Sequence, residues 1–459
     1  MIEKLVLPEV RELIQADDLA TLGEVLNDWL PPDLVGVIQE LDDSEKIQVF
    51  RSLEGLLASE TFGYLNLTTQ QRLLDELSAE EGAGILGEMP PDDRTALLAE
   101  LPGDQADRLL ALLSPEDRAV AQSLLQYEKD SIGRLMTPDY VTVRKDWTVK
   151  RVLDHVRTHG RDSETLNVLY VVDGKNTLID DVRIREILLA PLNSNVRDVM
   201  DDQFVALKVT DDKRSAVAVF RKYDRSALPV VNSEGTLVGI VTIDDVLDVA
   251  ERQATEELQR FGGLEALEDS YTGTPTLTLV RKRAYWLVVL FVGEMLTATA
   301  MGFYERQIEK AVVLALFVPL IISSGGNSGS QAATLIIRAM ALGEVRLRDW
   351  WSVMRRELLS GLLLGTLLGT IGFLRIGIWS AFSGIYGPHW ALVGLTVAFS
   401  LLGIVSWGTF AGSMLPFVLK RVGLDPATSS APFVATLVDV TGLVIYFTVA
   451  VVILRGTLL

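Results

Sequence analysis

The chain has 459 residues, enough for several domains, and it contains no cysteine. Residues 1–280 hold 53 acidic and 28 basic side chains, whereas residues 281–459 hold 8 and 14. The acidic first part disfavours nucleic-acid binding, which needs positive charge against phosphates, but it suits metal cations. The lack of cysteine excludes disulfides, thiolate catalysis and thiolate metal sites. The first 17 residues are charged and contain no long apolar run, so we expect no signal peptide.

Residues 1–132 show the periodicity of short helices. Prolines beside acidic residues recur at Pro31-Pro32-Asp33, Pro90-Pro91-Asp92 and Pro115-Glu116, and leucines spaced three and four apart follow them. Proline in a first helical turn, with acids beside it, suits the free N–H groups and the helix dipole. Short helices at fairly regular spacing predict an acidic, α-solenoid-like domain. An irregular helical domain is the alternative.

Residues 133–194 and 195–250 follow one pattern twice. Each unit contains a β-branched strand, a polar turn, a second strand and a helix, and the expected strands are 169–172, 178–182, 227–231 and 237–241. The two units resemble a tandem pair of CBS (α/β) domains. CBS pairs often bind adenine nucleotides, and the resemblance implies Thr242 and Asp245 as nucleotide contacts. The first unit has Arg183 and Glu186 at the corresponding positions, so ATP binding stays open.

Residues 251–280 connect the CBS pair to the rest of the chain. An acidic amphipathic helix is expected from Asp248 to about Tyr271, interrupted at Gly262-Gly263. Residues 281–459 then contain five apolar windows, each near or above the ~20 residues that cross a bilayer. Arginine and lysine gather before the first window and after the second and fourth. This asymmetry predicts a multi-pass protein of the cell membrane with a cytoplasmic N-terminus and an external C-terminus. The windows are 284–304, 311–342, 358–382, 391–419 and 432–454.

The second window contains a polar, glycine-rich run from Pro319 to Gln331. Such residues predict irregular backbone within the membrane, which is tolerated where it lines a cavity. Freed carbonyls, together with Asn327 and Gln331, would offer oxygen ligands to a hydrated cation. Tight helix packing through small residues is the alternative.

A carboxylate, Asp439, lies inside the fifth window. A charge at the bilayer centre costs roughly 3 kcal/mol or more, so it is expected to face a partner or a water-filled path. Mg²⁺ keeps several waters and usually takes one or two carboxylates. One aspartate per chain offers few ligands to a divalent cation. We therefore expect a homodimer with the pore near its twofold axis. Glu294 and Arg375 are further charges within the spans, without an assigned role.

Several motifs resemble the MgtE family of magnesium channels and transporters. They are the GGNxGxQ run at 325–331, Ile337-Arg338-Ala339, Asp425-Pro426-Ala427 and Pro432–Thr436 leading to Asp439. The resemblance covers the chain in order: helical N domain, CBS pair, connecting "plug" helix and five spans. It implies a homodimeric Mg²⁺ channel, closed when intracellular Mg²⁺ bridges acidic cytosolic faces, with Mg²⁺ as the ion it binds.

The resemblance also implies residues for each metal site. In the pore these are Asp439, Asn327, Gly325, Gly326, Gln331 and Ala435. At the regulatory faces they are Asp224, Asp244, Asp245, Asp248, Glu256 and Glu257. In the N domain, where register is less certain, they are Asp92, Asp93, Asp104 and Asp107. Gln253 and Ala431 depart from the family pattern, which puts one regulatory site and the outer pore lining in doubt.

Two other classes of function were weighed. An anion channel regulated by CBS domains would need basic anion sites in the membrane, whereas the polar groups there are carboxylate and amide. A membrane-tethered sensor or enzyme would need a catalytic set, and the three histidines, His155, His159 and His389, are scattered. We therefore expect no enzyme activity and no obligate partner beyond the bilayer and a second copy. Selectivity among Mg²⁺, Mn²⁺, Co²⁺ and Ca²⁺ stays open, since all accept oxygen ligands.

Overall fold

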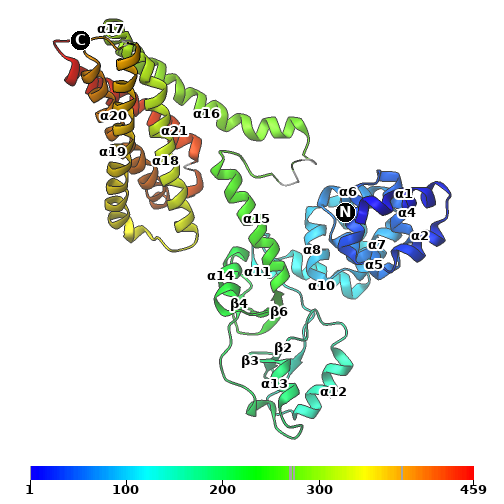
Figure 1. Ribbon diagram of the computed structural model, residues 1–459. Coiled ribbons are helices and arrows are strands. Elements are labelled where there is room, and N and C mark those ends of the chain that lie inside the picture. Colours follow the sequence, from blue (N-terminus) through cyan, green and yellow to red (C-terminus); the bar gives the residue numbers. More distant parts are fainter. Residues whose placement is uncertain (1, 268–270, 272–273, 384–385, 429, 459) are drawn as a thin grey trace. The chain divides into compact units, whose positions relative to one another are not determined.

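The computed structural model describes residues 2–267, 271, 274–383, 386–428 and 430–458. They form two compact units, Met1–Gln253 and Ala254–Leu459, and helix α15 runs through the boundary between them (Figure 1). Unit 1 begins with ten short helices, most of them capped at the N-terminus by an Asp, Asn or Ser side chain or started by a proline. They are α1 (Ile2–Gln15), α2 (Leu19–Leu26), α3 (Pro31–Gln39), α4 (Asp43–Ser52), α5 (Gly55–Gly63), α6 (Leu67–Glu76), α7 (Ala79–Glu88), α8 (Pro91–Glu100), α9 (Gly103–Leu112) and α10 (Pro115–Leu125).

These ten helices stack with a two-helix repeat. Helix α5 packs on α3 and α7, α7 packs on α9, and α4 packs on α2 and α6. Each helix therefore contacts the next but one along the chain, which is the arrangement of a solenoid. One continuous apolar core runs through the stack from Val10 to Ala121. The predicted α-solenoid-like domain is confirmed.

The CBS pair follows as two copies of one three-stranded sheet, each with a parallel outer strand beside an antiparallel hairpin. The hairpins carry the β-branched residues that the sequence placed there, and their strands are almost fully buried. The two sheets meet through the bridges Thr137↔Ile240 and Thr177↔Thr236. The elements are α11 (Ile132–Leu135), β1 (Thr142–Val143), α12 (Val149–His159), β2 (Val168–Val172), β3 (Leu178–Arg183), α13 (Ile184–Leu189), η1 (Val196–Asp198), β4 (Leu207–Lys208), α14 (Lys213–Tyr223), β5 (Ala227–Val231) and β6 (Leu237–Thr242).

The connecting helix is shorter than expected. Helix α15 (Ile243–Phe261) ends directly before Gly262, and Gly263 adopts φ +75°, a left-handed conformation that terminates helices. Residues 264–267 have no regular structure, so the expected continuation to Tyr271 is wrong for them. Residues 268–270 lie outside the described part of the chain. The glycine pair therefore ends the helix instead of merely interrupting it.

Unit 2 contains the five expected spans, each a helix long and apolar enough to cross a membrane. Four of them share an apolar core, whereas α16 is almost wholly exposed within the chain and packs mainly on α21. The exposed surface of such a membrane helix faces either lipid or another protein chain. The elements are α16 (Thr276–Phe303), α17 (Glu305–Lys310), η2 (Val312–Phe317), α18 (Val318–Ala341), η3 (Leu347–Asp349), α19 (Trp350–Ser383), α20 (Trp390–Arg421), η4 (Pro426–Thr428) and α21 (Ala431–Leu454).

The glycine-rich run of the second span is regular helix. Helix α18 is continuous, so the predicted irregular backbone with freed carbonyls is wrong. The small residues serve close packing instead: a Cβ at Gly408 of α20 would lie 2.5 Å from the carbonyl oxygen of Gly325, and one at Gly412 would collide with that of Gly329. Two backbones can approach this closely only where both lack side chains. The packing alternative explains the glycines.

Candidate functional site

Asp439 lies where α21 crosses α18. A Cβ added to Gly326 would be 3.5 Å from the Asp439 Oδ1 atom and 3.3 Å from the Ala435 Cβ. Gly326 thus leaves the space that the carboxylate uses. Asp439 is half-buried in the single chain, and the charged group that acts on it electrostatically is Glu294 of α16, not an arginine. Among the described residues, no cationic side chain therefore neutralises this carboxylate.

Helix α18 also carries two of the predicted polar pore residues. Asn327 and Gln331, one helical turn apart, are both exposed, and Asn327 Nδ2 donates to Ser323 Oγ at 3.4 Å. Gly325, by contrast, packs against Ile404 and Val438, so its place is inside the helix bundle. Among the predicted pore residues, the structure brings Asp439, Gly326 and Ala435 together, whereas Asn327 and Gln331 lie exposed along α18.

The segment before α21 is tied to the end of α15. Arg260 donates to Asp425 Oδ2 at 2.9 Å and to Glu256 Oε2 at 3.4 Å. Trp286 of α16 donates its ring N–H to Ser430 Oγ at 3.0 Å, directly before α21 begins. The end of the connecting helix and the start of the span that carries Asp439 are thus linked through side chains of unit 2.

Unit 1 contains an acidic cluster where the helical domain meets the second CBS unit. It combines Asp92 and Asp93, in the first turn of α8, with Asp244, Asp245 and Asp248 of α15, and these carboxylates act on one another electrostatically. Asp92 is only 7% exposed, and its Oδ1 atom has no hydrogen-bond partner. A buried, unpartnered carboxylate is costly, so this cluster is strained unless a cation neutralises it.

The pKa values of these carboxylates also indicate an unfavourable concentration of negative charge. Burial, and then the neighbouring Asp245, Asp93 and Glu164, raise the pKa of Asp92 well above its usual value. Burial followed by Asp248 and Asp244 raises the pKa of Asp93 to about 6. The pKa of Asp245 rises to about 7, chiefly through burial, although Thr242 donates to it. Like charges in a desolvated site favour protons or a bound metal ion over free carboxylates.

Two members of this cluster were not foreseen from the sequence. Asp139 and Glu164 are joined by a backbone hydrogen bond of 2.8 Å, and the pKa of each is raised by burial and by neighbouring carboxylates. The buried Arg94, 2.9 Å from Asp117, also acts on Asp139. These residues lie in loops and helices without a distinctive pattern, so only the tertiary fold reveals them.

The other predicted regulatory residues lie elsewhere. Asp224 ends α14 in a left-handed conformation, with φ 51°. Asp104 is exposed and paired with Arg108 at 3.1 Å, and Asp107 is also exposed. Glu256 contacts Arg260, and Glu257 also has a partner. None of these pairings brings them into the cluster around Asp92.

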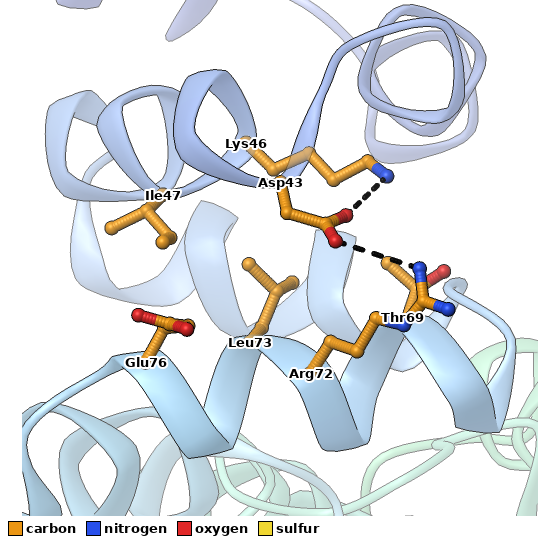
Figure 2. A pocket seen from close by; sticks show the side chains of 7 residues that line it. All are labelled: Asp43, Lys46, Ile47, Thr69, Arg72, Leu73 and Glu76. Carbon is orange, nitrogen blue, oxygen red and sulfur yellow. Dashed lines mark hydrogen bonds and ion pairs between the residues drawn. The ribbon is translucent and has the colours of Figure 1, made fainter.

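Among the described residues, no three carboxylate or imidazole groups are arranged as a finished metal site. A pocket in the helical domain also offers none, because Asp43 at its rim pairs with Lys46 at 3.2 Å and Arg72 at 3.5 Å. Figure 2 shows these two ion pairs together with Leu73 and Glu76, which line the same pocket. The acidic cluster and Asp439 therefore remain the candidates for cation binding.

The CBS pair has polar groups of its own. Thr242 Oγ1 donates to Asp245 Oδ2 at 2.6 Å, which caps α15 locally. In the first unit, the buried Asp181 lies 3.6 Å from Arg225, and the Asp181 Oδ2 and Tyr170 Oη atoms have no hydrogen-bond partner. Unpartnered buried oxygens of this kind fit a ligand that donates hydrogen bonds, such as the amine or hydroxyl groups of a nucleotide.

The fold and these sites define a class: an integral membrane protein with five spans, a carboxylate within one span, and a soluble acidic part that carries a CBS pair. A family described as divalent cation transporter matches residues 318–449. The MgtE intracellular N domain matches residues 30–130, and the CBS domain matches 132–193 and 196–252. The chain belongs to the MgtE family.

The sequence is similar to those of named relatives over most or nearly all of its length. It is 38% identical to the magnesium transporter MgtE of Thermus thermophilus, over 99% of this chain and 100% of that protein. It is 29% identical to the magnesium transporter MgtE of Bacillus subtilis, over 73% of this chain and 72% of that protein. Among solved structures, the cytosolic domain of the Mg²⁺ channel MgtE in complex with ATP is 35% identical, with a TM-score of 0.51, and covers 53% of this chain and 99% of that one.

Proposed function

We propose that this protein conducts Mg²⁺ across the membrane and closes when Mg²⁺ accumulates in the cytosol. The observation that carries the proposal is Asp439, a carboxylate in an apolar span, which packs over Gly326 and has no basic partner among the described residues. A hydrated Mg²⁺ ion can be held there through its own water molecules, because Mg²⁺ gives up water reluctantly. The names of the relatives support this substrate.

The functional unit is proposed to be a homodimer. One carboxylate cannot neutralise a divalent cation, whereas two copies of Asp439 about a twofold axis can. Support comes from the exposure of Asn327, Gln331 and Glu294, and from α16, which packs mainly on α21 and is otherwise exposed within its own chain. Polar groups facing lipid would be costly, so a second chain that covers them lowers the free energy of the assembly.

Closure is proposed to use the acidic cluster around Asp92. Mg²⁺ between α8 and α15 would replace the protons that this cluster otherwise retains, and would thereby hold the two helices together. The cytosolic N-terminus and external C-terminus belong to the same scheme, supported by the arginines and lysines of 281–283, 338–356 and 420–421. Because α15 continues into unit 2, the position of this helix can be transmitted to the segment before α21.

Adenine nucleotide is proposed as a second cytosolic ligand. The solved cytosolic domain of a relative holds ATP. In this chain, Asp181 and Tyr170 offer unpartnered buried oxygens, whereas Thr242 and Asp245 bind each other. The nucleotide contacts proposed here, Asp181 and Tyr170, therefore differ from the Thr242 and Asp245 that the sequence led us to expect. Titration of the full-length protein with ATP, compared for wild type and Asp181→Asn, tests which unit is used.

The direct test of the pore is Mg²⁺ flux into liposomes that contain the purified protein. Asp439→Ala and Asp439→Asn should abolish most flux, since both remove the charge that holds the ion. Glu309→Gln, an exposed acid of α17, should conduct like wild type and controls for reconstitution. Undiminished flux in both Asp439 variants would refute the pore role. Flux that internal Mg²⁺ does not reduce would refute the closure mechanism alone.

A further inference from the structure

We propose that the start of α19 carries a binding site for an anionic phospholipid. The site, here called the arginine–tryptophan face, consists of Trp351, Arg355, Leu358 and Leu362, with Arg346 and Arg348 of the preceding segment. It lies entirely within unit 2 and is distinct from Asp439 and from the acidic cytosolic cluster.

The four helical residues occupy one stripe. They are separated by four, three and four positions, which places them on the same side of a helix with 3.6 residues per turn. Trp351, Leu358 and Leu362 are 54%, 40% and 52% exposed, and Arg355 is exposed between them. An indole, a guanidinium and a row of leucines thus follow one another along an unpartnered surface.

Charge on this face is mostly unpaired. Residues 346–356 contain four arginines and one acid, Asp349. Arg348 lies 3.8 Å from Asp349 with 76% of its side chain exposed, a weak contact. For Arg355, no ion pair with a carboxylate is found among the described residues. The face therefore has the sign and the free donors to bind an anion.

Helix length places these donors at the level of lipid headgroups. The span that includes α19 covers 36 residues, Leu347–Phe382, whereas about 20 residues cross the hydrocarbon. The apolar stretch, which runs from Leu358 to Leu374 before Arg375, starts after Glu357, so Arg355 precedes it by one turn or less. A guanidinium there can hold a phosphate through two parallel hydrogen bonds, while an acyl chain lies along Leu358 and Leu362.

Topology alone requires positive charge near a span but not this order of side chains. An exposed tryptophan at the interface, an arginine one turn deeper and leucines beyond it match the parts of a phospholipid in order from water to hydrocarbon: polar headgroup, phosphate and acyl chain. A second protein copy would present the same positive charge, so contact between two such faces is disfavoured. The geometry therefore favours a lipid over a protein partner.

The test titrates purified full-length protein with phosphatidylglycerol, or with phosphatidylcholine, and counts bound lipids by native mass spectrometry. Wild type should bind phosphatidylglycerol more tightly than phosphatidylcholine. Arg355→Gln should weaken phosphatidylglycerol binding roughly five-fold, the equivalent of about 1 kcal/mol for one charge near a membrane surface. Arg355→Gln with Arg348→Gln should weaken it further. Soluble glycerol phosphate at equal concentration should not displace the lipid, because it lacks the acyl chains.

Arg306→Gln is the matched control, since Arg306 is also an exposed arginine but belongs to α17, outside this face. Arg355→Lys keeps the charge but loses the planar fork, so its affinity for phosphatidylglycerol should lie between those of wild type and Arg355→Gln. This variant tests the proposal even if Arg355→Gln folds poorly. Equal binding of the two lipids, or the same affinity in Arg355→Gln and Arg306→Gln, would overturn the proposal. Because lipid is counted directly, this outcome is independent of whether the protein conducts Mg²⁺.

Discussion

Arg260 Nη1 donates to Asp425 Oδ2 at 2.9 Å and thereby joins the last turn of the connecting helix to the segment before α21. The same guanidinium reaches Glu256, a residue that the family resemblance assigns to regulation, at 3.4 Å. Asp425 also accepts the Ala427 N–H at 2.9 Å, which orders the turn before α21. The Arg260 guanidinium thus holds two segments together through carboxylates on each.

Removing this link should weaken closure by a modest amount. Arg260 and Asp425 are 41% and 44% exposed, and ion pairs of such exposure contribute about 0.2–1 kcal/mol. Arg260→Ala should therefore raise the internal Mg²⁺ concentration needed for half-inhibition of flux by up to about five-fold. Flux into liposomes with graded internal Mg²⁺ measures the shift.

A charge swap distinguishes the link from a general loss of stability. Arg260→Asp combined with Asp425→Arg should restore part of the inhibition that each single variant loses, since the pair is rebuilt with opposite polarity. Arg306→Ala, which changes an exposed arginine of α17, is the control. Additive effects of the two swapped residues would show that the contact has no role in closure.

Asp92→Asn should stabilise the protein when divalent cations are absent. The substitution removes a buried charge whose Oδ1 atom has no partner, so the gain should be about 1 kcal/mol or more, or about 2–4 °C in Tm for a unit of this size. The same variant should gain less from added Mg²⁺ than wild type does. Thermal unfolding of the full-length protein in chelator and in Mg²⁺ measures both effects. Asp104→Asn, at an exposed acid paired with Arg108, should change neither.

The sequence predicted the architecture well because each part has a strong local signal. Five apolar windows, two copies of a strand–turn–strand pattern and recurrent prolines were enough for the spans, the CBS pair and the solenoid. Asp439 stood out for the same reason: a charge in an apolar helix is visible without a structure. Periodicity and composition are properties of contiguous residues, so the sequence alone reveals them.

Features that depend on distant segments were missed or misjudged. Asp139 and Glu164 join Asp92 only through the packing of the CBS pair on the helical domain. The glycines of α18 indicated irregular backbone, yet they fit against Gly408 and Gly412 of α20, some eighty residues away. A run of small residues permits both structures, and the partner surface decides between them.

Stability should depend on pH in a direction opposite to that of ordinary ion pairs. In the folded state Asp93 and Asp245 keep protons up to pH values of about 6 and 7, whereas unfolded aspartate loses them near pH 4. The folded state therefore binds more protons between pH 4 and 7, and stability from these groups falls as pH rises through that range. Asp42 and Glu81, whose pKa values are lowered mainly by backbone N–H donors, act in the opposite sense.

The contribution of Asp93 and Asp245 to stability is obtained by comparing wild type with a variant that lacks both carboxylates. Urea unfolding of wild type and of Asp93→Asn with Asp245→Asn, in chelator from pH 5 to pH 8, should show the wild type losing stability relative to the double variant as pH rises. Excess Mg²⁺ should abolish this trend, since the metal replaces the protons. A constant difference across the pH range would mean that these two carboxylates titrate normally.

Gly412→Ala should prevent α18 and α20 from packing. A Cβ at this position would collide with the carbonyl oxygen of Gly329, and because that neighbour is backbone, no side chain can move aside. Overpacking of this kind costs about 1–3 kcal/mol or more, so the variant should give little folded protein and a lower Tm. Gly302→Ala is the matched control, because it is also a helix glycine in a span, a Cβ there meets nothing within 4 Å, and alanine favours helix. Thermal unfolding of both variants in detergent, followed by size-exclusion chromatography, measures the contrast. Equal stability of the two would show that the contact between α18 and α20 is looser than the structure places it.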